Sequence, residues 1–226
     1  MSIKLLFLDM EGTIYAKQHV RMSDGEISDH NSLWSRLMKE LGENAISDNE
    51  KTIEKWENGV YKSYLEWCDE SVRNLARHGL TKELFQEIMY SIDYNPEVKE
   101  TISEVHRRGI KTAIISGGFA HQTKRAQVDL KINHACSAVE IFWDEQGKPS
   151  HWNIFPSDFE GKVDYVKLLS REYKLSLTEC AFIGDGKNDV QIAKEVSVSF
   201  AYQAHEQLKK NATYTIDRFS EILKFI

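Results

Sequence analysis

The residues best suited to chemistry lie near the start of the chain, where two acids follow a short apolar run. Asp9 and Glu11 come directly after residues 3–8 and are joined to Gly12 and Thr13. Side chains two residues apart on an extended strand share one face, so the two carboxylates should lie together. One carboxylate can attack phosphorus and form an aspartyl phosphate, while a second acid protonates the departing alkoxide and later activates water. The pair therefore predicts phosphoryl chemistry.

Two acids repel a phosphate dianion, so other segments must supply positive charge and hydrogen-bond donors. Asp185 and Asp189 follow the apolar run 180–183 and offer the hard oxygen ligands that Mg²⁺ takes together with water and substrate oxygens. Ser116 and the backbone amides of the two glycines after it can hold phosphate oxygens, because glycine lets a backbone approach closely. Lys162 opens a segment of helical period, and its ammonium can offset the carboxylates.

The elements that must position these residues alternate between strand and helix. Apolar runs typical of strands buried on both faces occupy residues 3–8, 111–115, 180–183 and 196–202. Helical periodicity covers residues 96–108, with Asn95 as the expected N-cap, and residues 163–173 and 217–226. This alternation predicts an α/β fold with a doubly wound parallel sheet, whose ligands bind beyond the carboxyl ends of the strands. The polar turns described above all fall at that edge.

A helical insertion interrupts this pattern after the first strand. We expect a helical cap over residues 16–90, including a helix capped by Thr81, and a catalytic core made of residues 1–15 and 91–226. Residues 138–154 contain a glycine turn between two strand-like runs and predict a small β-hairpin.

Composition excludes several classes of partner. The 226 residues carry 29 Lys and Arg against 35 Asp and Glu, a net charge of -6, so no broad basic surface is expected for a nucleic acid. No apolar run approaches the roughly 18 residues of a membrane span. The three cysteines have no metal-ligand spacing and read as free thiols. With no leader pattern at the N-terminus, these features predict a cytoplasmic protein without nucleic-acid or membrane partners.

The order of the four polar segments resembles the signature of the haloacid dehalogenase (HAD) superfamily. Its first motif, D-x-D-G-T, matches residues 9–13; its second, a Ser or Thr after a strand, matches Ser116; its third is a lone Lys; its fourth, G-D-x-x-x-D, matches residues 184–189. Within the superfamily, the motif sequences are most similar to those of phosphoserine phosphatases. The similar segments are Ser-Gly-Gly-Phe 116–119, Gly-Lys-Val-Asp 161–164, Gly-Asp-Gly-Lys-Asn-Asp 184–189 and Ala-Tyr-Gln-Ala 201–204. Their helical cap also lies between the first two motifs.

This resemblance implies a Rossmann-like HAD core that hydrolyses a small phosphorylated metabolite with Mg²⁺ as cofactor, through an aspartyl phosphate. Asp9 is implied as the nucleophile and a metal ligand. Glu11 is implied as the acid and base, with its backbone carbonyl on the metal. Asp185 completes the metal site, and Asp189 supports it.

The resemblance also implies a phosphate-binding set. Ser116, Gly117 and Lys162 would hold the phosphate, and Asn188 would lie near the transferred group. Lys167 is the alternative to Lys162 as the lysine of the third motif, but the sequence at 161–164 is more similar to the motif sequence of the family.

Two features differ from the family pattern. Glu11 replaces the usual second Asp, which moves the acid outward by roughly 1.5 Å, one C–C bond. Residues 15–19 contain no Glu to match the one that binds the substrate amine in phosphoserine phosphatases, and neither Arg73 nor Arg77 can be placed in register with their cap Arg for the substrate carboxylate. Phosphoserine is therefore one candidate among small phosphorylated metabolites.

Three other interpretations stay open. The same scaffold could transfer the phosphoryl group to an alcohol acceptor. A receiver-like signalling module phosphorylated on Asp9 would need a similar Asp, Ser, Lys and metal set, but such modules lack a proton donor at i+2 and a large insertion. A non-catalytic metabolite-binding protein is disfavoured, because no member of the catalytic set is missing. The sequence makes no prediction of the oligomeric state.

Overall fold

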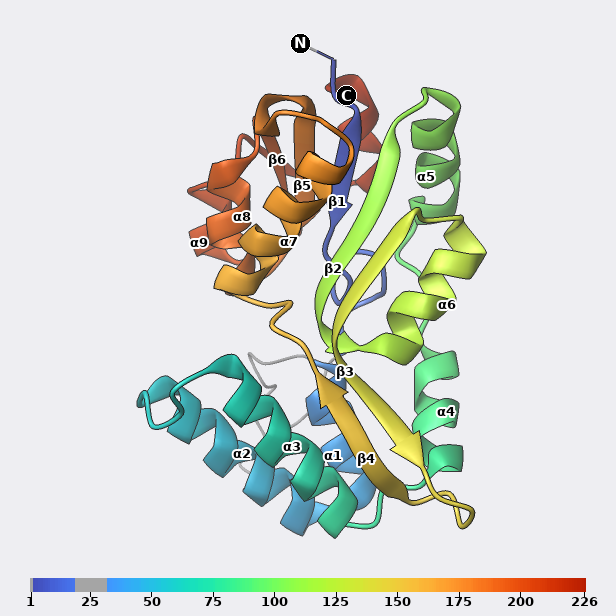
Figure 1. Ribbon diagram of the computed structural model, residues 1–226, viewed down its shortest axis with the longest axis vertical. Helices are drawn as coiled ribbons and strands as arrows, with labels where there is room; N and C mark the ends of the chain where they lie inside the picture. The colour runs from blue at the N-terminus through green and yellow to red at the C-terminus, as the bar shows by residue number, and fades with distance from the viewer. Residues whose placement is uncertain (1, 19–31) are drawn as a thin grey trace. The chain divides into compact units, whose positions relative to one another are not determined.

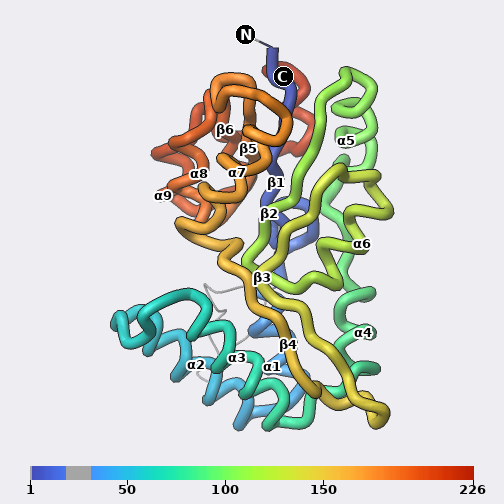
Figure 2. The backbone as a smooth tube through the Cα atoms, in the orientation of Figure 1, coloured from blue at the N-terminus to red at the C-terminus, as the bar shows by residue number. Residues whose placement is uncertain are grey.

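The chain forms two compact units in a computed structural model that describes residues 2–18 and 32–226. The first unit comprises Met1–Ala16, Asp93–Ser137 and Ser157–Ile226, and the second comprises Lys17–Ile92 and Ala138–Pro156. The path of the backbone through them can be followed in Figures 1 and 2. The predicted cap at 16–90 and the segment 15–19 extend partly outside the described residues.

A seven-stranded sheet runs in the order β4-β3-β2-β1-β5-β6-β7. Its strands are β1 Leu5–Leu8, β2 Lys111–Phe119, β3 His134–Trp143, β4 Pro149–Ile154, β5 Cys180–Gly184, β6 Val198–Tyr202 and β7 Tyr214–Ile216. Strand β1 pairs in parallel with β2 and β5, and the pairs β5–β6 and β6–β7 are also parallel. Strands β3 and β4 form an antiparallel hairpin. The predicted α/β fold, with its mostly parallel sheet and its hairpin, is confirmed.

Helices of the first unit cover both faces of this sheet (Figure 1), with α5 and α6 on one face and α7 and α8 on the other. They are α5 Val98–Arg107, α6 Ala120–Leu130, α7 Glu160–Glu172, α8 Val190–Glu195 and α9 Glu206–Lys209, with 3-10 turns η1 Leu177–Glu179, η2 Lys187–Asp189 and η3 Phe219–Lys224. Phe7 and Phe182 pack in one core with Val166 of α7 and Ile192 of α8. Burial from both sides explains why the strand runs are apolar without alternation.

The helix predicted at 96–108 begins later than its sequence suggests. Its N-cap is Glu97, in the left-handed conformation at φ 67°, so the expectation of Asn95 as N-cap is wrong. The Asn95 Nδ2 instead donates to the backbone carbonyls of Gly12, Thr13 and Tyr15 at 3.1, 2.9 and 3.1 Å. The Asn95 side chain thus bonds to the turn of the first motif, and α5 has no side-chain cap hydrogen bond.

Two other elements differ from the sequence prediction. Strand β2 does not stop at Ile115 but continues through Ser116 to Phe119, and α6 begins at the next residue. The helix expected at 217–226 is only the short 3-10 segment η3. Its apolar residues Phe219 and Ile222 are buried, so these two turns of 3-10 helix place the apolar side chains in the core without a longer α-helix.

The second unit contains four helices among its described residues, α1 Leu33–Leu41, α2 Glu43–Glu57, α3 Tyr64–Arg77 and α4 Lys82–Ser91. Thr81 caps α4, as predicted, by accepting a hydrogen bond from the Leu84 amide at 3.2 Å. Residues 138–154 of the β3–β4 hairpin group with this unit, although they lie in the range predicted for the core. The Trp152 Nε1 donates to Asp69 of α3 at 2.9 Å, which ties the hairpin to the helices. No helix within the described ranges is long and apolar enough to cross a bilayer.

Candidate active site

Strand register brings the first, second and fourth motifs to one edge of the sheet. Leu8 of β1 pairs with Ile114 of β2 and with Ile183 of β5. The next residue, Asp9, donates its backbone N–H to the Ile183 carbonyl at 2.9 Å. Asp9 therefore lies one step from Ser116, within β2, and one step from Asp185, which directly follows β5.

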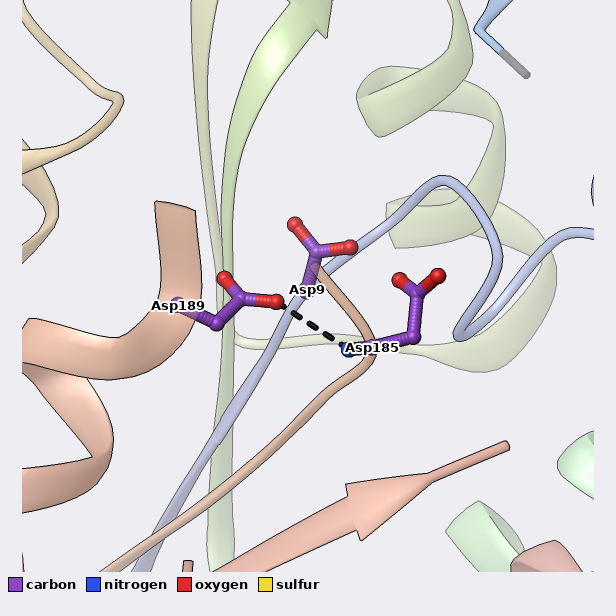
Figure 3. Close-up of side chains that lie close together, drawn as sticks. All are labelled: Asp9, Asp185 and Asp189. Atoms are coloured by element: carbon purple, nitrogen blue, oxygen red, sulfur yellow. Dashed lines mark hydrogen bonds between the residues drawn. The ribbon is translucent and has the colours of Figure 1, made fainter. Parts of the chain in front are cut away.

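Three aspartates form a buried cluster at this edge. Asp9, Asp185 and Asp189 each place a carboxylate oxygen within 4.8 Å of the other two. Figure 3 shows the three carboxyl groups converging from the β1 end, the β5 end and η2. Their residues are 6%, 9% and 0% exposed, respectively. Carboxylates are seldom buried so deeply without cationic partners.

Lys162 lies against this cluster and is fully buried. Its Nζ donates to Asp9 Oδ1 and to Asp189 Oδ1, both at 2.6 Å. Burial opposes the charged form of the amine, but the carboxylates of Asp189 and Asp9 outweigh it and hold the Lys162 pKa well above its ordinary value. Lys167, the alternative in the sequence, has a side chain 48% exposed and pairs with Glu195 at 3.5 Å. The structure brings Lys162, and not Lys167, to the acids.

One ammonium does not balance the charge of the aspartates. Burial raises the pKa of Asp9 well above its ordinary value, and Asp189 and Asp185 raise it further against the opposing effect of Lys162. A divalent cation would relieve this excess of negative charge, and carboxylate oxygens are the donors that Mg²⁺ prefers. The residues present therefore fit a metal site.

The hydrogen bonds divide the acids between direct and supporting roles. Asp189 Oδ1 accepts from Lys162, and its Oδ2 accepts from the backbone amides of Asp185 and Gly186 at 3.1 and 3.0 Å. Both oxygens of Asp189 are thus used in holding the loop and the lysine. Asp9 and Asp185 are the better candidates for direct metal ligands.

A close approach of backbone to side chain fixes the first motif against the fourth. Gly12 has φ +79°, and a Cβ at this position would lie 2.3 Å from Asp185 Oδ2. A side chain would therefore be strained and would clash, which explains the glycine. The hydroxyl of the next residue, Thr13, donates to Asp185 Oδ1 at 3.2 Å. Together these contacts hold the Asp185 carboxylate beside the turn that follows Asp9.

The second motif presents its polar groups at the end of β2. Ser116 is buried, and its Oγ accepts a hydrogen bond from the Gly118 amide at 3.0 Å. A Cβ on Gly118 would lie 2.6 Å from Glu11 Oε1, so the Glu11 carboxylate rests against this part of the strand. Gly117 lies between Ser116 and Gly118, and α6 starts at Ala120. The positive end of a helix dipole therefore adjoins the acid and the serine.

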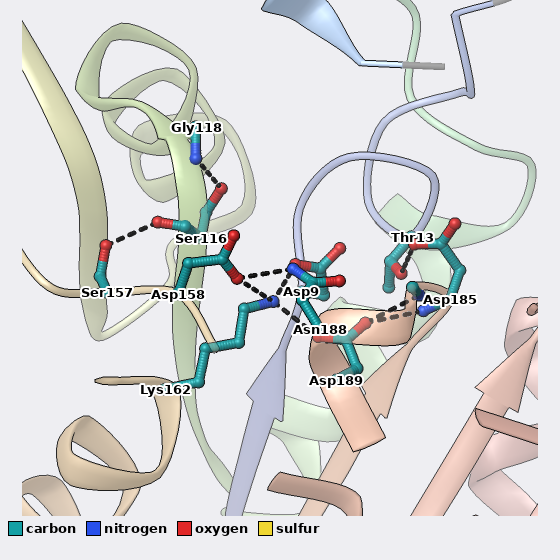
Figure 4. Close-up of polar contacts among 11 residues, drawn as sticks. Asp9, Thr13, Ser116, Gly118, Ser157, Asp158, Lys162, Asp185, Asn188 and Asp189 are labelled. Carbon is teal, nitrogen blue, oxygen red and sulfur yellow. Dashed lines mark hydrogen bonds and ion pairs between the residues drawn. The ribbon is translucent and has the colours of Figure 1, made fainter. Parts of the chain in front are cut away.

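The structure also adds residues that the motifs did not indicate. These residues are Asp158 and Ser157. Asp158 Oδ1 accepts a hydrogen bond from Asn188 Nδ2 at 2.6 Å, and Ser157 donates its hydroxyl to the Ser116 carbonyl at 2.7 Å. Figure 4 shows Ser116, Ser157 and Asp158 on one side of Asp9 and Lys162, and Thr13 and Asp185 on the other. The signal for Asp158 in the sequence was only its spacing, four residues before Lys162.

The two arginines considered for a substrate carboxylate have partners within the helical unit. Arg73 Nε donates to Asp69 Oδ2 at 2.8 Å, and the guanidinium lies over the ring of Trp152. Arg77 donates to Asn74 Oδ1 at 2.9 Å. Arg77 also lies 3.8 Å from Asp48 Oδ2 of α2, so both arginines pair with residues of the helical unit.

Comparison with known proteins identifies the family. Residues 3–197 match the family model described as haloacid dehalogenase-like hydrolase. The chain belongs to this family. The resemblance of the HAD motifs to those of phosphoserine phosphatases is also confirmed by relatives that carry that name.

Two such relatives are similar over part of their length. The phosphoserine phosphatase of Lactococcus lactis is 27% identical over 66% of this chain and 69% of its own. That of Streptococcus thermophilus is 31% identical over 61% of this chain and 64% of its own. A solved structure titled a phospho-aspartyl intermediate analogue of phosphoserine phosphatase superposes with a TM-score of 0.76 at 20% identity, covering 100% of both chains. At that identity the likeness shows a shared HAD fold.

Proposed function

We propose that the protein is a Mg²⁺-dependent phosphomonoesterase that hydrolyses a small phosphorylated metabolite through a phosphorylated Asp9. The observation that carries this proposal is the placement of the Asp9 carboxylate between the Lys162 ammonium and the Asp185 carboxylate, at the carboxyl end of β1. An acid so placed can be paired with a cation on one side and can attack phosphorus with its other oxygen.

The chain's own residues account for both halves of the reaction. Lys162 takes Oδ1 of Asp9, which leaves Oδ2 to bond to phosphorus as the ester P–O bond breaks. Glu11 gives its proton to the departing alkoxide. In the second half, Glu11 takes a proton from water, the water oxygen bonds to phosphorus, and the Asp9 carboxylate leaves as inorganic phosphate forms.

The phosphate must be held against these acids. The Ser116 hydroxyl, the Gly117 amide and the Lys162 ammonium are the donors we assign to its oxygens. Asp9 and Asp185 would hold Mg²⁺, with Asp189 supporting the loop that carries Asp185. When bound, the cation would supply charge neutralisation for the transferring phosphoryl group.

Phosphoserine is the first substrate to test within this class. The two relatives reported above are named phosphoserine phosphatases. Sugar phosphates, polyol phosphates and nucleotides complete a panel that varies the leaving alcohol while it keeps the phosphate.

The test is phosphate release over this panel with Mg²⁺, for the wild type and for Asp9→Asn. We expect release from at least one small monoester and a loss of at least about a thousandfold in Asp9→Asn, because the amide is not a nucleophile. Phosphorylated acceptor is measured beside free phosphate, which separates hydrolysis from transfer to an alcohol. Full Mg²⁺-dependent release by Asp9→Asn, or no release from any substrate, would overturn the proposal.

A further inference from the structure

A further acid, Asp158, lies at the site and has no part in the reaction as written above. The residue is 9% exposed, and its Oδ1 lies 2.6 Å from Asn188 Nδ2 and 3.8 Å from Lys162 Nζ. Burying a carboxylate is costly unless it is paired and hydrogen-bonded. Another negative charge beside a phosphate-binding lysine would also repel the substrate. The retention of this acid therefore calls for a reason.

Helix capping does not supply that reason. Asp is a favoured N-cap, but the N-cap of α7 is Phe159, which makes no side-chain cap bond. Phe159 has φ +48° and ψ -122°, a conformation that costs a residue with a side chain about 1–3 kcal/mol. The chain thus adopts a strained residue between Asp158 and the helix, and the Asp158 carboxylate accepts from Asn188 and from the backbone N–H of Phe159.

The segment that carries Asp158 is also fixed from the other side. Ser157 is fully buried and donates its hydroxyl to the backbone carbonyl of Ser116 at 2.7 Å. Residues 157 and 158 therefore connect β2, through Ser116, to η2, through Asn188. Figure 4 draws both hydrogen bonds, from Ser157 to Ser116 and from Asn188 to Asp158.

The bond to Asp158 determines which way the Asn188 amide points. An amide nitrogen carries two hydrogens, and Asp158 takes one of them. Asp158 is 3.8 Å from the ammonium that binds Asp9, so the Asn188 amide reaches the edge of the nucleophile's surroundings. With the nitrogen held on that side, its second hydrogen can donate to an anion at Asp9, where the carbonyl oxygen of a flipped amide would repel it.

We propose that Asp158 is a positioning residue, which fixes the Asn188 amide as a hydrogen-bond donor to the phosphoryl group bound at Asp9. This inference rests on the proposed phosphatase function. It attributes the orientation of the Asn188 amide to its hydrogen bond with Asp158. Asp158 acts through its acceptor oxygen and has no contact with the reacting atoms.

The test is a double-mutant cycle of Asp158→Ala and Asn188→Ala, with Asp158→Asn as the conservative variant. We measure kcat and KM with Mg²⁺, inhibition by inorganic phosphate, and the shift in melting temperature that inorganic phosphate produces. Ser170→Ala, which removes a buried hydrogen bond to Val166 in the same helix, is the matched control. If Asp158→Ala does not fold, Asp158→Ser replaces it, because a serine is too short to reach Asn188.

We expect Asp158→Ala to lower kcat about 10- to 100-fold and to weaken inhibition by phosphate, since a misplaced donor can cost about a hundredfold. Asp158→Asn should stay within about threefold of the wild type, because its carbonyl oxygen still accepts from Asn188. The double variant should be no slower than Asn188→Ala alone. The control should leave kcat and phosphate inhibition unchanged.

Three results would overturn the inference. They are wild-type kcat in Asp158→Ala, a loss in the double variant that is the product of the two single losses, and an Asp158→Asn variant as slow as Asp158→Ala. A wild type with no phosphatase activity would instead refute the proposed function. In that case the melting shift with inorganic phosphate still reports whether Asp158 organises the anion site.

Discussion

Two lysine–carboxylate pairs, one in each unit, have almost the same geometry and very different surroundings. Lys162 contacts Asp9 and Asp189 at 2.6 Å, with the lysine fully buried and its partners 153 and 27 positions away in the chain. Lys55 contacts Glu70 at 2.8 Å, with side chains 45% and 35% exposed and 15 positions apart. Distance alone would rank these pairs as equals.

Their surroundings assign them different roles. An exposed ion pair is worth about 0–1 kcal/mol, because water already solvates both charges. A buried pair must recover a desolvation cost of several kcal/mol per ion, and replacing it by apolar groups is often neutral or stabilising. The buried cluster of the first unit is therefore poorly explained as a stabilising device and well explained as a site. The pair on α2 and α3 is explained as part of a solvated surface.

The largest difference is expected from removing one lysine of α7 at a time. Lys162→Met leaves Asp9, Asp189 and Asp158 without their cation, which should lower the free energy of unfolding by about 3–5 kcal/mol and abolish most phosphate release. Lys167→Met, on the same helix, should change stability by less than about 0.5 kcal/mol. Urea unfolding and phosphate release measure the two effects. Equal changes in the two variants would remove the contrast between buried and exposed charge.

A smaller contrast is expected between two glycines. At Gly118, alanine places a Cβ 2.6 Å from Glu11 Oε1, so Gly118→Ala should displace the acid and lower kcat about 10- to 100-fold. At Gly42, which has φ +103°, no atom lies within 4 Å of an added Cβ. Gly42→Ala should therefore cost only about 1 kcal/mol of backbone strain and leave kcat unchanged. A Gly118→Ala enzyme with wild-type kcat would show that Glu11 does not depend on this approach.

The smallest effect is expected at the exposed pair itself. The hydrogen bond from Lys55 lowers the pKa of Glu70, against a smaller opposing effect of burial. A lowered pKa stabilises the fold at pH values above the ordinary Glu value near 4.3, and this contribution disappears as the pH falls through the folded-state pKa. Lys55→Met should lower stability by less than about 1 kcal/mol at pH 7, and this loss should disappear as the pH falls through the folded-state pKa of Glu70. A loss of several kcal/mol would erase the distinction drawn above.

The sequence was sufficient to predict the central strands, the hairpin and the motifs at the edge of the sheet, but not the short edge strand β7. Buried parallel strands are marked by continuous apolar runs, and the polar residues that end them stand out at positions 9, 116 and 185. Strand register then places these residues together without further information. The choice of Lys162 over Lys167 also followed from the sequence, because residues 161–164 are similar to the motif sequence of the family.

What the sequence did not indicate depends on contacts across long separations. Asn95 had the appearance of a helix cap, but its partners are carbonyls about 80 positions earlier, and no local pattern reports them. Asp158 contacts Asn188 across 30 positions, from a loop that belongs to no motif. The range predicted for the core, 91–226, includes the hairpin, whereas the Trp152 hydrogen bond ties the hairpin to α3.

The central claim is that the Asp9 carboxylate bonds to phosphorus, and trapping that bond tests it most directly. The enzyme is mixed with Mg²⁺ and p-nitrophenyl phosphate, quenched in acid within one turnover, and treated with borohydride, which reduces an aspartyl phosphate to homoserine. Peptide mass spectrometry then locates the reduced residue. The account predicts homoserine at position 9, and none in protein incubated without substrate. Phosphate release during the same turnover without any modification of Asp9 would contradict it.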